Sequence, residues 1–402
     1  MKIIENGSIT SPKGFKAAGI SAGIKKSGKK DIGIILSEVE AAAAGVFTLN
    51  KMCAAPITVC KEVALKPQAR AIVVNSGCAN ACTGELGLEN AWKMLNYSTE
   101  VLGLNEKEAY ICSTGIIGET LPMDKIKSGI LEASKELKKE NADDFANAIL
   151  TTDTFMKKVA YEFELDGKTV TIAGVAKGSG MIEPNMATML TFITTDLSIS
   201  PYLLKRTLKK VADNSFNMVV VDGDTSTNDS MIVLANGLAG NKVIISETEE
   251  NYKVFYEAFL KVAQDLAKMI AKDGEGATKF LEINVVGALT KKDAKLAAKA
   301  IAKSPLVKTA FFGEDPNWGR VVCAAGYSGA ELNPKKISLH IGNLQLVFNG
   351  LNLDFDKGEA KAIMQNDEIE LTIDLGVGAA SATVWSCDFS YDYVKINGEY
   401  HT

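Results

Sequence analysis

Hydrophobic and polar positions alternate along this chain in two distinct ways, which predict strands in some segments and helices in others. Residues 158–165 and 169–173 alternate with the period of two that is typical of half-buried strands. Asp166 and Gly167, which lie between them, match a type I′ turn. The two segments therefore predict a β-hairpin, the clearest in the chain. This hairpin leads directly into a glycine-rich loop that begins at Lys177.

Other segments have the apolar spacing of amphipathic helices or the short apolar runs of buried strands. The predicted helices are residues 85–102, 122–139, 143–150, 201–214, 249–272 and 291–302. The predicted strands are residues 32–36, 44–47, 69–74, 109–112, 189–193, 218–221, 231–235, 280–286, 310–312 and 393–396, with strands dominating from 336 onward. This mixture predicts an α/β fold in which helices cover packed β-sheets.

The composition is that of a soluble globular protein that is long enough for a large core. The 402 residues are 47% hydrophobic and 23% charged, and the formal net charge is -5. The acidic balance argues against nucleic acid or an anionic membrane as a partner. No apolar run approaches the roughly 20 residues that span a bilayer, and residues 1–7 lack a signal-peptide core. We therefore expect a cytoplasmic protein.

The cysteines and histidines restrict the chemistry of the protein. Seven cysteines are scattered along the chain, and this odd number favours reduced thiols. Cys78 and Cys82 have no second pair or nearby histidine that would complete a zinc site, so we expect no metal. Only His340 and His401 could supply an imidazole, and His340 lies in a segment that alternates like a strand. An acyl-transfer enzyme with this sequence would therefore need a different base.

The segment that follows the hairpin, residues 177–190, joins the glycine-rich loop to a predicted strand and allows three interpretations. A phosphate-binding loop would need its lysine after the glycines and before a helix, and here the order is reversed. A plain glycine-rich turn is the second interpretation. The third is self-cleavage, in which the Thr188 hydroxyl attacks the Ala187 carbonyl and water releases an N-terminal Thr188. Its α-amino group, with an ordinary pKa of about 7.7–8.0, would then be the base for its own hydroxyl.

Motifs along essentially the whole chain resemble, in order, those of the ornithine acetyltransferases, which are glutamate N-acetyltransferases of the cyclic arginine pathway. These motifs are residues 75–84, 113–118, 151–153, 177–190, 222–229, 273–279, 313–320 and 397–402. The resemblance implies a DmpA-like and ornithine-acetyltransferase-like fold with a threonine nucleophile. It also implies self-cleavage between Ala187 and Thr188. The products would be an α chain, residues 1–187, and a β chain, residues 188–402, which stay associated.

The resemblance further implies a reaction and the residues that carry it. Thr188 would take the acetyl group from N-acetyl-L-ornithine and pass it to L-glutamate with ping-pong kinetics. Thr114 and Gly115 match the oxyanion-hole pair of the family. The matched substrate-contacting positions are Thr151, Lys177, Thr188, Glu275, Asn397 and Thr402. Among these, Lys177 suits a substrate carboxylate and Glu275 suits a substrate amino group.

The same resemblance implies no cofactor and leaves open acetyl-CoA as a co-substrate. The α and β chains are expected to form a heterotetramer or a larger assembly. The main alternative function is a self-processing amidase or aminopeptidase of related architecture, which would transfer the acyl group to water. Lys177, Glu275 and residues 397–402 favour an amino-acid acceptor instead. A binding protein without enzymatic activity is the third hypothesis.

Overall fold

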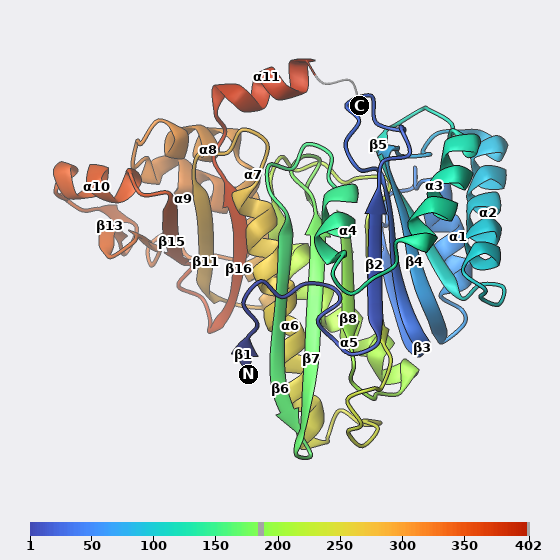
Figure 1. The fold of residues 1–402 in the computed structure, drawn as a ribbon. Coiled ribbons are helices and arrows are strands. Elements are labelled where there is room, and N and C mark those ends of the chain that lie inside the picture. Colours follow the sequence, from blue (N-terminus) through green and yellow to red (C-terminus); the bar gives the residue numbers. More distant parts are fainter. Residues whose placement is uncertain (184–188, 400–402) are drawn as a thin grey trace.

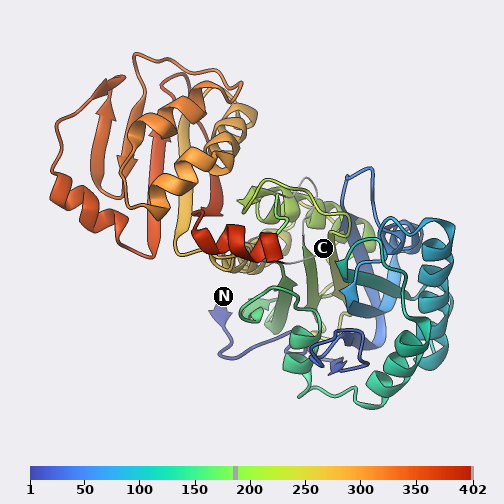
Figure 2. The same cartoon turned by 90° about the horizontal axis from the view of Figure 1, so that it is seen from above.

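The computed structural model describes residues 1–183 and 189–399, and these residues form two β-sheets with helices against their faces (Figure 1). Viewed from above, the smaller sheet and its helices lie to one side of the larger sheet (Figure 2). The predicted α/β class, with helices covering the sheets, is confirmed. The proposed boundary between an α chain and a β chain, at residues 187 and 188, lies outside the described residues and stays a prediction.

The larger sheet has nine strands. They are β1 (Lys2–Ile3), β2 (Phe15–Ile20), β3 (Ile32–Phe47), β4 (Gln68–Cys78), β5 (Ala109–Ile116), β6 (Lys157–Leu165), β7 (Lys168–Lys177), β8 (Leu190–Thr195) and β10 (Ser230–Ala235). Their order is β1-β6-β7-β8-β10-β3-β4-β5, with β2 paired to β3. The predicted hairpin is β6 and β7, and Asp166 and Gly167 have the positive φ angles, 52° and 70°, of a type I′ turn.

The smaller sheet has seven strands in the order β14-β13-β12-β15-β11-β16-β9. They are β9 (Val219–Val220), β11 (Phe280–Ala288), β12 (Ser338–Ile341), β13 (Leu344–Phe348), β14 (Leu351–Asn352), β15 (Glu368–Asp374) and β16 (Ala380–Cys387). A short 3-10 helix, η1 (Phe216–Met218), precedes β9.

Helices cover both faces of the larger sheet. One face is covered by α1 (Ala55–Val63), α2 (Gly84–Val101), α3 (Met123–Lys135) and α4 (Ala142–Ala148). The other face is covered by α5 (Pro201–Asp213) and α6 (Glu250–Lys272), and α6 also packs against β16 of the smaller sheet. The smaller sheet carries α7 (Lys291–Lys303), and the remaining helices are α8 (Pro305–Phe312), α9 (Trp318–Gly326), α10 (Lys357–Met364) and α11 (Tyr391–Glu399). Within the described residues, no helix is long and apolar enough to cross a membrane.

The central strands of the larger sheet are buried on both faces. In β10, Ile232 and Leu234 join the core beneath α1 to α4, whereas Met231 and Val233 join the core shared by α5, α6 and the smaller sheet. This alternation follows from the period of two in a strand. It explains why β10 is a continuous apolar run, since a strand with two buried faces has no polar side.

The two strands predicted at residues 32–36 and 44–47 are one strand, β3. Its first half pairs with β2, and its second half pairs with β10. The pairing of β3 with β4 shifts register between Leu36 and Ala41, and residues 38–40 are exposed. A bulge of this kind inserts polar residues into a strand without ending it, which is why the sequence reads as two strands.

The strand predicted at residues 310–312 is wrong, because these residues end the helix α8. Ser304 caps this helix, with its hydroxyl accepting from the Val307 N–H at 3.3 Å, and Pro305 is the first helical residue. A serine cap followed by proline is a strong start signal for a helix. The short apolar run of Ala310, Phe311 and Phe312 predicts a strand only if the cap at Ser304 and the proline after it are not considered.

The strand predicted at residues 393–396 is also wrong, because these residues belong to α11. The Ser390 hydroxyl accepts from the Asp392 N–H at 3.1 Å, and the Asn397 side chain donates to the Tyr393 carbonyl one turn earlier. Val394 is 70% exposed, so the apolar positions do not enter a sheet. The helix α10, which lies within the region predicted to be dominated by strands, begins at the cap Asp356.

Candidate active site

Six of the predicted site residues line one cavity, although they come from distant parts of the chain. They are Thr114, Gly115, Thr151, Lys177, Glu275 and Asn397. The first two lie near the end of β5, Lys177 ends β7, and Asn397 lies on α11. In Figure 1, α11 lies at the top of the molecule, the end at which β5 also ends. The other predicted residues, Ala187, Thr188 and Thr402, lie outside the described residues.

Both flanks of the predicted cleavage segment are anchored to residues that line the cavity. On the upstream side, the Glu183 N–H donates to the Asp224 carbonyl at 2.8 Å. On the downstream side, Leu190 begins β8 and pairs in register with Lys177 of β7. The described residues on both sides of this segment are therefore bonded to residues that line the cavity.

The carboxylate of Asp222 fixes the loop just before that segment. Its two oxygens accept from the N–H groups of Met181 at 2.6 Å and Ile182 at 2.8 Å. The Asp224 N–H donates to it as well, at 3.1 Å. Burial raises the pKa of Asp222, although these three N–H groups act in the opposite direction. Asp222 thus holds the glycine-rich loop against the cavity wall.

The backbone at the end of β5 is irregular where Thr114 and Gly115 face the cavity. Cys78 of β4 is partnered by both Thr114 and Ile116, which marks a bulge in the pairing. Gly115 has a φ angle of 128°, which L-residues with a side chain rarely adopt. Bulges next to active sites redirect backbone groups away from the regular ladder. This geometry suits a pair of residues that must present donors to an oxyanion.

An asparagine from the loop that precedes β10 supports this irregular backbone. The Asn228 side-chain amide donates to the carbonyls of Ala79 at 2.7 Å and Ser113 at 2.9 Å. The Thr227 hydroxyl donates to the Asn228 side-chain oxygen at 2.6 Å. Because these groups are buried, each lost partner would leave a costly unsatisfied polar group. The loop 222–229 therefore supports the β4–β5 edge from across the cavity.

The cavity carries charges of opposite sign on different segments. Lys177 provides a cation at the end of β7, and Glu275 provides a carboxylate after α6. The Asn397 amide donates to Glu275 Oε2 at 3.0 Å and so connects α11 to the wall. Burial, followed by the nearby carboxylates of Asp222 and Glu275, raises the pKa of Tyr393. Tyr393 therefore stays protonated and offers a hydroxyl donor.

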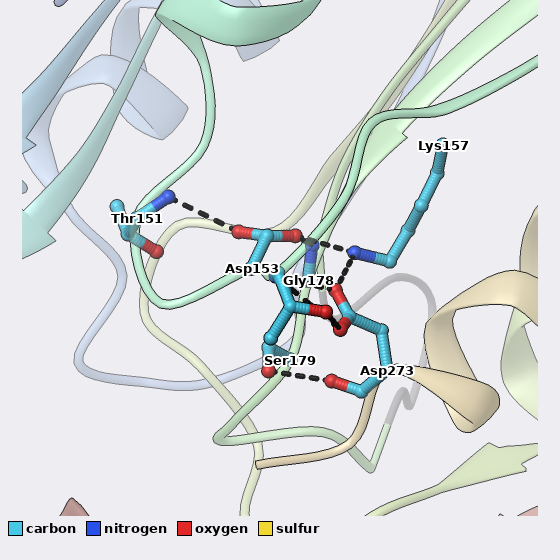
Figure 3. Close-up of polar contacts among 7 residues, drawn as sticks. Thr151, Asp153, Lys157, Gly178, Ser179 and Asp273 are labelled. Atoms are coloured by element: carbon cyan, nitrogen blue, oxygen red, sulfur yellow. Dashed lines mark hydrogen bonds and ion pairs between the residues drawn. The ribbon is translucent and has the colours of Figure 1, made fainter. Parts of the chain in front are cut away.

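A buried group of two aspartates and one lysine lies beside Thr151 and Gly178 (Figure 3). The Lys157 ammonium lies 2.7 Å from Asp153 Oδ1 and 2.5 Å from Asp273 Oδ2. The side chains of Lys157, Asp153 and Asp273 are 0%, 0% and 2% exposed. We call these three residues the buried triad.

Replacing Asp153 by asparagine should lower the free energy of unfolding near neutral pH, with a deficit that shrinks in acid. Burial alone would raise the pKa of Asp153, but Lys157, Lys177 and the Gly178 N–H bring it down to about 2. Because this value lies below the ordinary pKa of 3.8, the carboxylate stabilises the fold above roughly pH 4. That contribution, about 2 kcal/mol, is lost as the pH falls toward about 2.

Urea unfolding of the wild type and of Asp153→Asn, repeated from neutral pH downward, measures this deficit at each pH. A deficit that stays constant between about pH 5 and the lowest pH at which both proteins fold would contradict the assignment.

Sequence reasoning gave no role to several residues that shape this site. Asp153, Asp222 and Asp273 lie in motifs that the resemblance covers, but their function as acceptors of backbone N–H groups depends on segments distant in the sequence. Lys157 carries no local signal, since a lysine at the start of a strand is ordinarily exposed. Gly180 leaves room for the Glu275 carboxylate, since a Cβ there would lie 2.2 Å from Glu275 Oε2. The described residues hold no cluster that could bind a metal ion, and the predicted absence of metal and cofactor stays a prediction.

Comparisons with known proteins place this chain in a family. A model of the ArgJ family matches residues 16–402. The chain is 50% identical over 406 residues to the arginine biosynthesis bifunctional protein ArgJ of Caldanaerobacter subterraneus subsp. tengcongensis, with 100% of both chains covered. It is 48% identical over 400 residues to the ArgJ protein of Geobacillus kaustophilus, covering 99% of this chain and 97% of that one.

A solved structure is similar as well. The crystal structure of the arginine biosynthesis bifunctional protein ArgJ from Bacillus halodurans is 42% identical, with a TM-score of 0.51. The match covers 52% of this chain and 98% of the other chain.

Proposed function

The chain belongs to the ArgJ family, and from this premise we propose that it moves the acetyl group of N-acetyl-L-ornithine to L-glutamate through an acetyl-Thr188 intermediate. The predicted family, the acyltransferase class and the place in arginine biosynthesis are confirmed by the family match and by relatives at about half identity over the full length. The roles of individual residues are proposals, as are the self-cleavage and the acceptor.

One observation carries the proposal. Residues that match the oxyanion-hole and substrate positions of the family meet at a single cavity, although they are separated by up to 283 positions in the chain. Thr114 and Gly115 of β5, Lys177 of β7 and Glu275 all line this cavity, and Asn397 of α11 donates to Glu275. A set of loop residues without a shared function has no physical reason to converge in this way. The convergence supports their action on one bound substrate.

The proposed reaction uses these groups in order. The Thr188 hydroxyl attacks the acetyl carbonyl, and the α-amino group of Thr188 takes its proton. The oxygen that becomes negative is stabilised by donors of Thr114 and Gly115. The C–N bond to ornithine then breaks, and the proton returns to the departing amine. L-Glutamate attacks the acetyl ester by the same steps in reverse, with Lys177 facing a carboxylate and Glu275 facing an amino group.

Self-cleavage between Ala187 and Thr188 is part of the proposal, since it creates the amino group that acts as the base. The Bacillus halodurans relative supports it, because a chain in that structure corresponds to only 52% of this chain. Residues 188–402 are likewise slightly more than half of the 402 residues. The scarcity of histidine also supports it, because His340 lies on β12, outside the cavity lining.

Incubation of the purified protein with N-acetyl-L-ornithine tests the proposal directly. We expect two fragments that meet at Ala187 and Thr188, and we expect the C-terminal fragment to gain the mass of one acetyl group. L-Glutamate added afterwards should remove that mass and appear as N-acetylglutamate, and the double-reciprocal plots should be parallel, as in a ping-pong mechanism. A single unmodified chain in fully active protein would overturn the covalent mechanism.

The amidase or aminopeptidase alternative gives a different result in the same experiment. Water would then accept the acetyl group, so acetate would form at one rate with or without L-glutamate. Lys177 and Glu275 favour the amino-acid acceptor, because two opposite charges in one cavity complement a zwitterion.

The proposal also covers a second acetyl donor and the assembly of the two chains. Acetyl-CoA is a second acetyl donor in our proposal, and formation of N-acetylglutamate from acetyl-CoA and glutamate alone tests it. We propose that the α and β chains assemble as a heterotetramer or a larger complex in the cytoplasm, which sedimentation of the purified protein and cell fractionation would test.

Replacing Gly180 by alanine should raise the KM for N-acetyl-L-ornithine by about tenfold, with a smaller effect on kcat. The new Cβ would lie 2.2 Å from Glu275 Oε2, and a flexible carboxylate can move away without unfolding the protein. That movement would break the hydrogen bond from the Asn397 amide to Glu275. Steady-state kinetics measure the change. Gly326→Ala at the end of α9 is the control, since its Cβ would meet no atom within 4 Å in the part of the chain that the structure describes. Equal KM values for both variants would contradict the role of Glu275.

A further inference from the structure

The buried triad of Asp153, Lys157 and Asp273 lies outside the cavity, yet each of its carboxylates contacts a segment that carries a proposed substrate residue. We infer that these three are positioning residues that hold Thr151, Lys177 and Glu275 in the geometry that binds substrate. This inference rests on the proposed function of the cavity. It assigns a role to residues that do not themselves line the cavity.

Asp153 connects two of the three substrate segments. Its Oδ2 accepts from the Thr151 N–H at 3.1 Å, and its Oδ1 accepts from the Gly178 N–H at 2.7 Å. Gly178 directly follows Lys177, so one carboxylate fixes the backbone at both substrate positions, as Figure 3 shows. The distance between Thr151 and Lys177 is therefore set by a side chain that never reaches the substrate.

Asp273 connects the third segment. Its carboxylate accepts from the Thr154 N–H at 3.1 Å and from the Thr154 hydroxyl. Its backbone carbonyl accepts from the Ser179 hydroxyl at 2.6 Å, and the Glu275 N–H donates to the Ser179 carbonyl at 3.1 Å. The turn that carries Glu275 is thus tied to the loop that follows Lys177.

Lys157 joins the two halves of this network. It begins β6, opposite Ala176 of β7, and its ammonium bridges the carboxylates of Asp153 and Asp273. With two carboxylates and one ammonium, the triad has an excess negative charge and almost no exposure to water. A buried ionic group of this kind adds little to stability compared with apolar packing. Its presence beside a binding cavity is better explained by precise positioning of charged ligand-binding groups.

Two variants with opposite changes of charge test the inference. Asp153→Asn removes a negative charge, and Lys157→Met removes a positive charge. If the triad positions the substrate residues, both variants should raise the KM for N-acetyl-L-ornithine and for L-glutamate by about ten- to a hundredfold. The reduction of kcat should be smaller in both, because the triad is bonded to the segments that carry the substrate residues, whereas we assign the chemical step to Thr188, Thr114 and Gly115.

Asp143→Asn is the matched control. It breaks the surface ion pair between Asp143 and Lys158, the residue next to Lys157, at a site where Asp143 is half exposed. Its KM should stay at the wild-type value. Shifts of KM in opposite directions for the two triad variants would show a simple field effect and overturn the inference. A lowered melting temperature with unchanged KM in Asp153→Asn would also overturn it.

The same measurements separate this inference from the proposed function. Wild-type protein that transfers no acetyl group would refute the proposed function itself. Wild-type protein that transfers the acetyl group, with an Asp153→Asn variant of unchanged KM, would leave the function intact and refute the positioning role. Because Asp153→Asn leaves Lys157 paired with Asp273, this variant should fold even where Lys157→Met does not.

Discussion

Replacing Thr188 by alanine should yield a single uncleaved chain of 42.9 kDa that transfers no measurable acetyl group. The change removes the hydroxyl that attacks the Ala187 carbonyl, so no new N-terminus forms. It also removes the acetyl acceptor. Loss of a covalent nucleophile removes most of the rate enhancement, and we expect kcat to fall by at least about a thousandfold. Denaturing electrophoresis and intact-mass measurement follow the cleavage, and the transfer of acetyl to glutamate follows the activity.

Thr188→Ser is the informative control for this prediction. Serine retains a hydroxyl and, after cleavage, an α-amino group, so it should still be cleaved and keep part of its activity. A Thr188→Ala variant that is cleaved normally would show that another residue breaks the chain. A variant that stays whole but transfers acetyl at the wild-type rate would remove Thr188 from the mechanism. Circular dichroism should show that both variants fold.

The parts of the fold that the sequence predicts best are those in which local signals agree. The hairpin of β6 and β7 has alternating strands and a turn whose two residues have the required positive φ angles. The helix α6 has apolar residues at helical spacing, and this spacing predicts almost the same boundaries, residues 249–272. In these segments, propensity, periodicity and burial all favour one structure.

The errors arise where local and tertiary signals disagree. Tyr393, Val394 and Ile396 favour strands by propensity, but they lie on α11, a helix none of whose residues is buried. A helix that rests on the rim of a cavity needs no apolar face toward a core, so the usual pattern is absent. The strand prediction is wrong because α11 lies beside the cavity and not in a sheet. The same position lets Asn397 donate to Glu275.

The residues of the site also differ in how far local sequence signals predict them. The motifs of residues 113–118 and 273–279 are local features of the sequence, and their resemblance to the family is the basis for the proposed roles of Thr114, Gly115 and Glu275. The buried triad could not be predicted in this way. Lys157 becomes buried only because Asp153 and Asp273 pair with it in the folded protein. Asp273 is 116 positions from Lys157 in the sequence.

Replacing Gly115 by alanine should lower kcat for acetyl transfer by about 10²- to 10³-fold, with little change in KM. The backbone of Gly115 has a φ angle of 128°, and an added Cβ would lie 2.4 Å from the carbonyl carbon of Gly77. It would also lie 2.7 Å from the Cys78 nitrogen. These neighbours are backbone atoms of β4, so the β5 end itself must move.

The expected split between kcat and KM follows from when the oxyanion exists. Its negative charge develops in the transition state, so misplaced donors at Thr114 and Gly115 weaken the transition state more than the bound substrate. Gly118→Ala is the matched control, because Gly118 also has a positive φ angle, 86°, but a Cβ there would meet no atom of residues 1–183 or 189–399 within 4 Å. Both variants should lose some thermal stability from backbone strain. If Gly118→Ala lost as much kcat as Gly115→Ala, strain alone would explain the defect, and Gly115 would lose its place in the oxyanion hole.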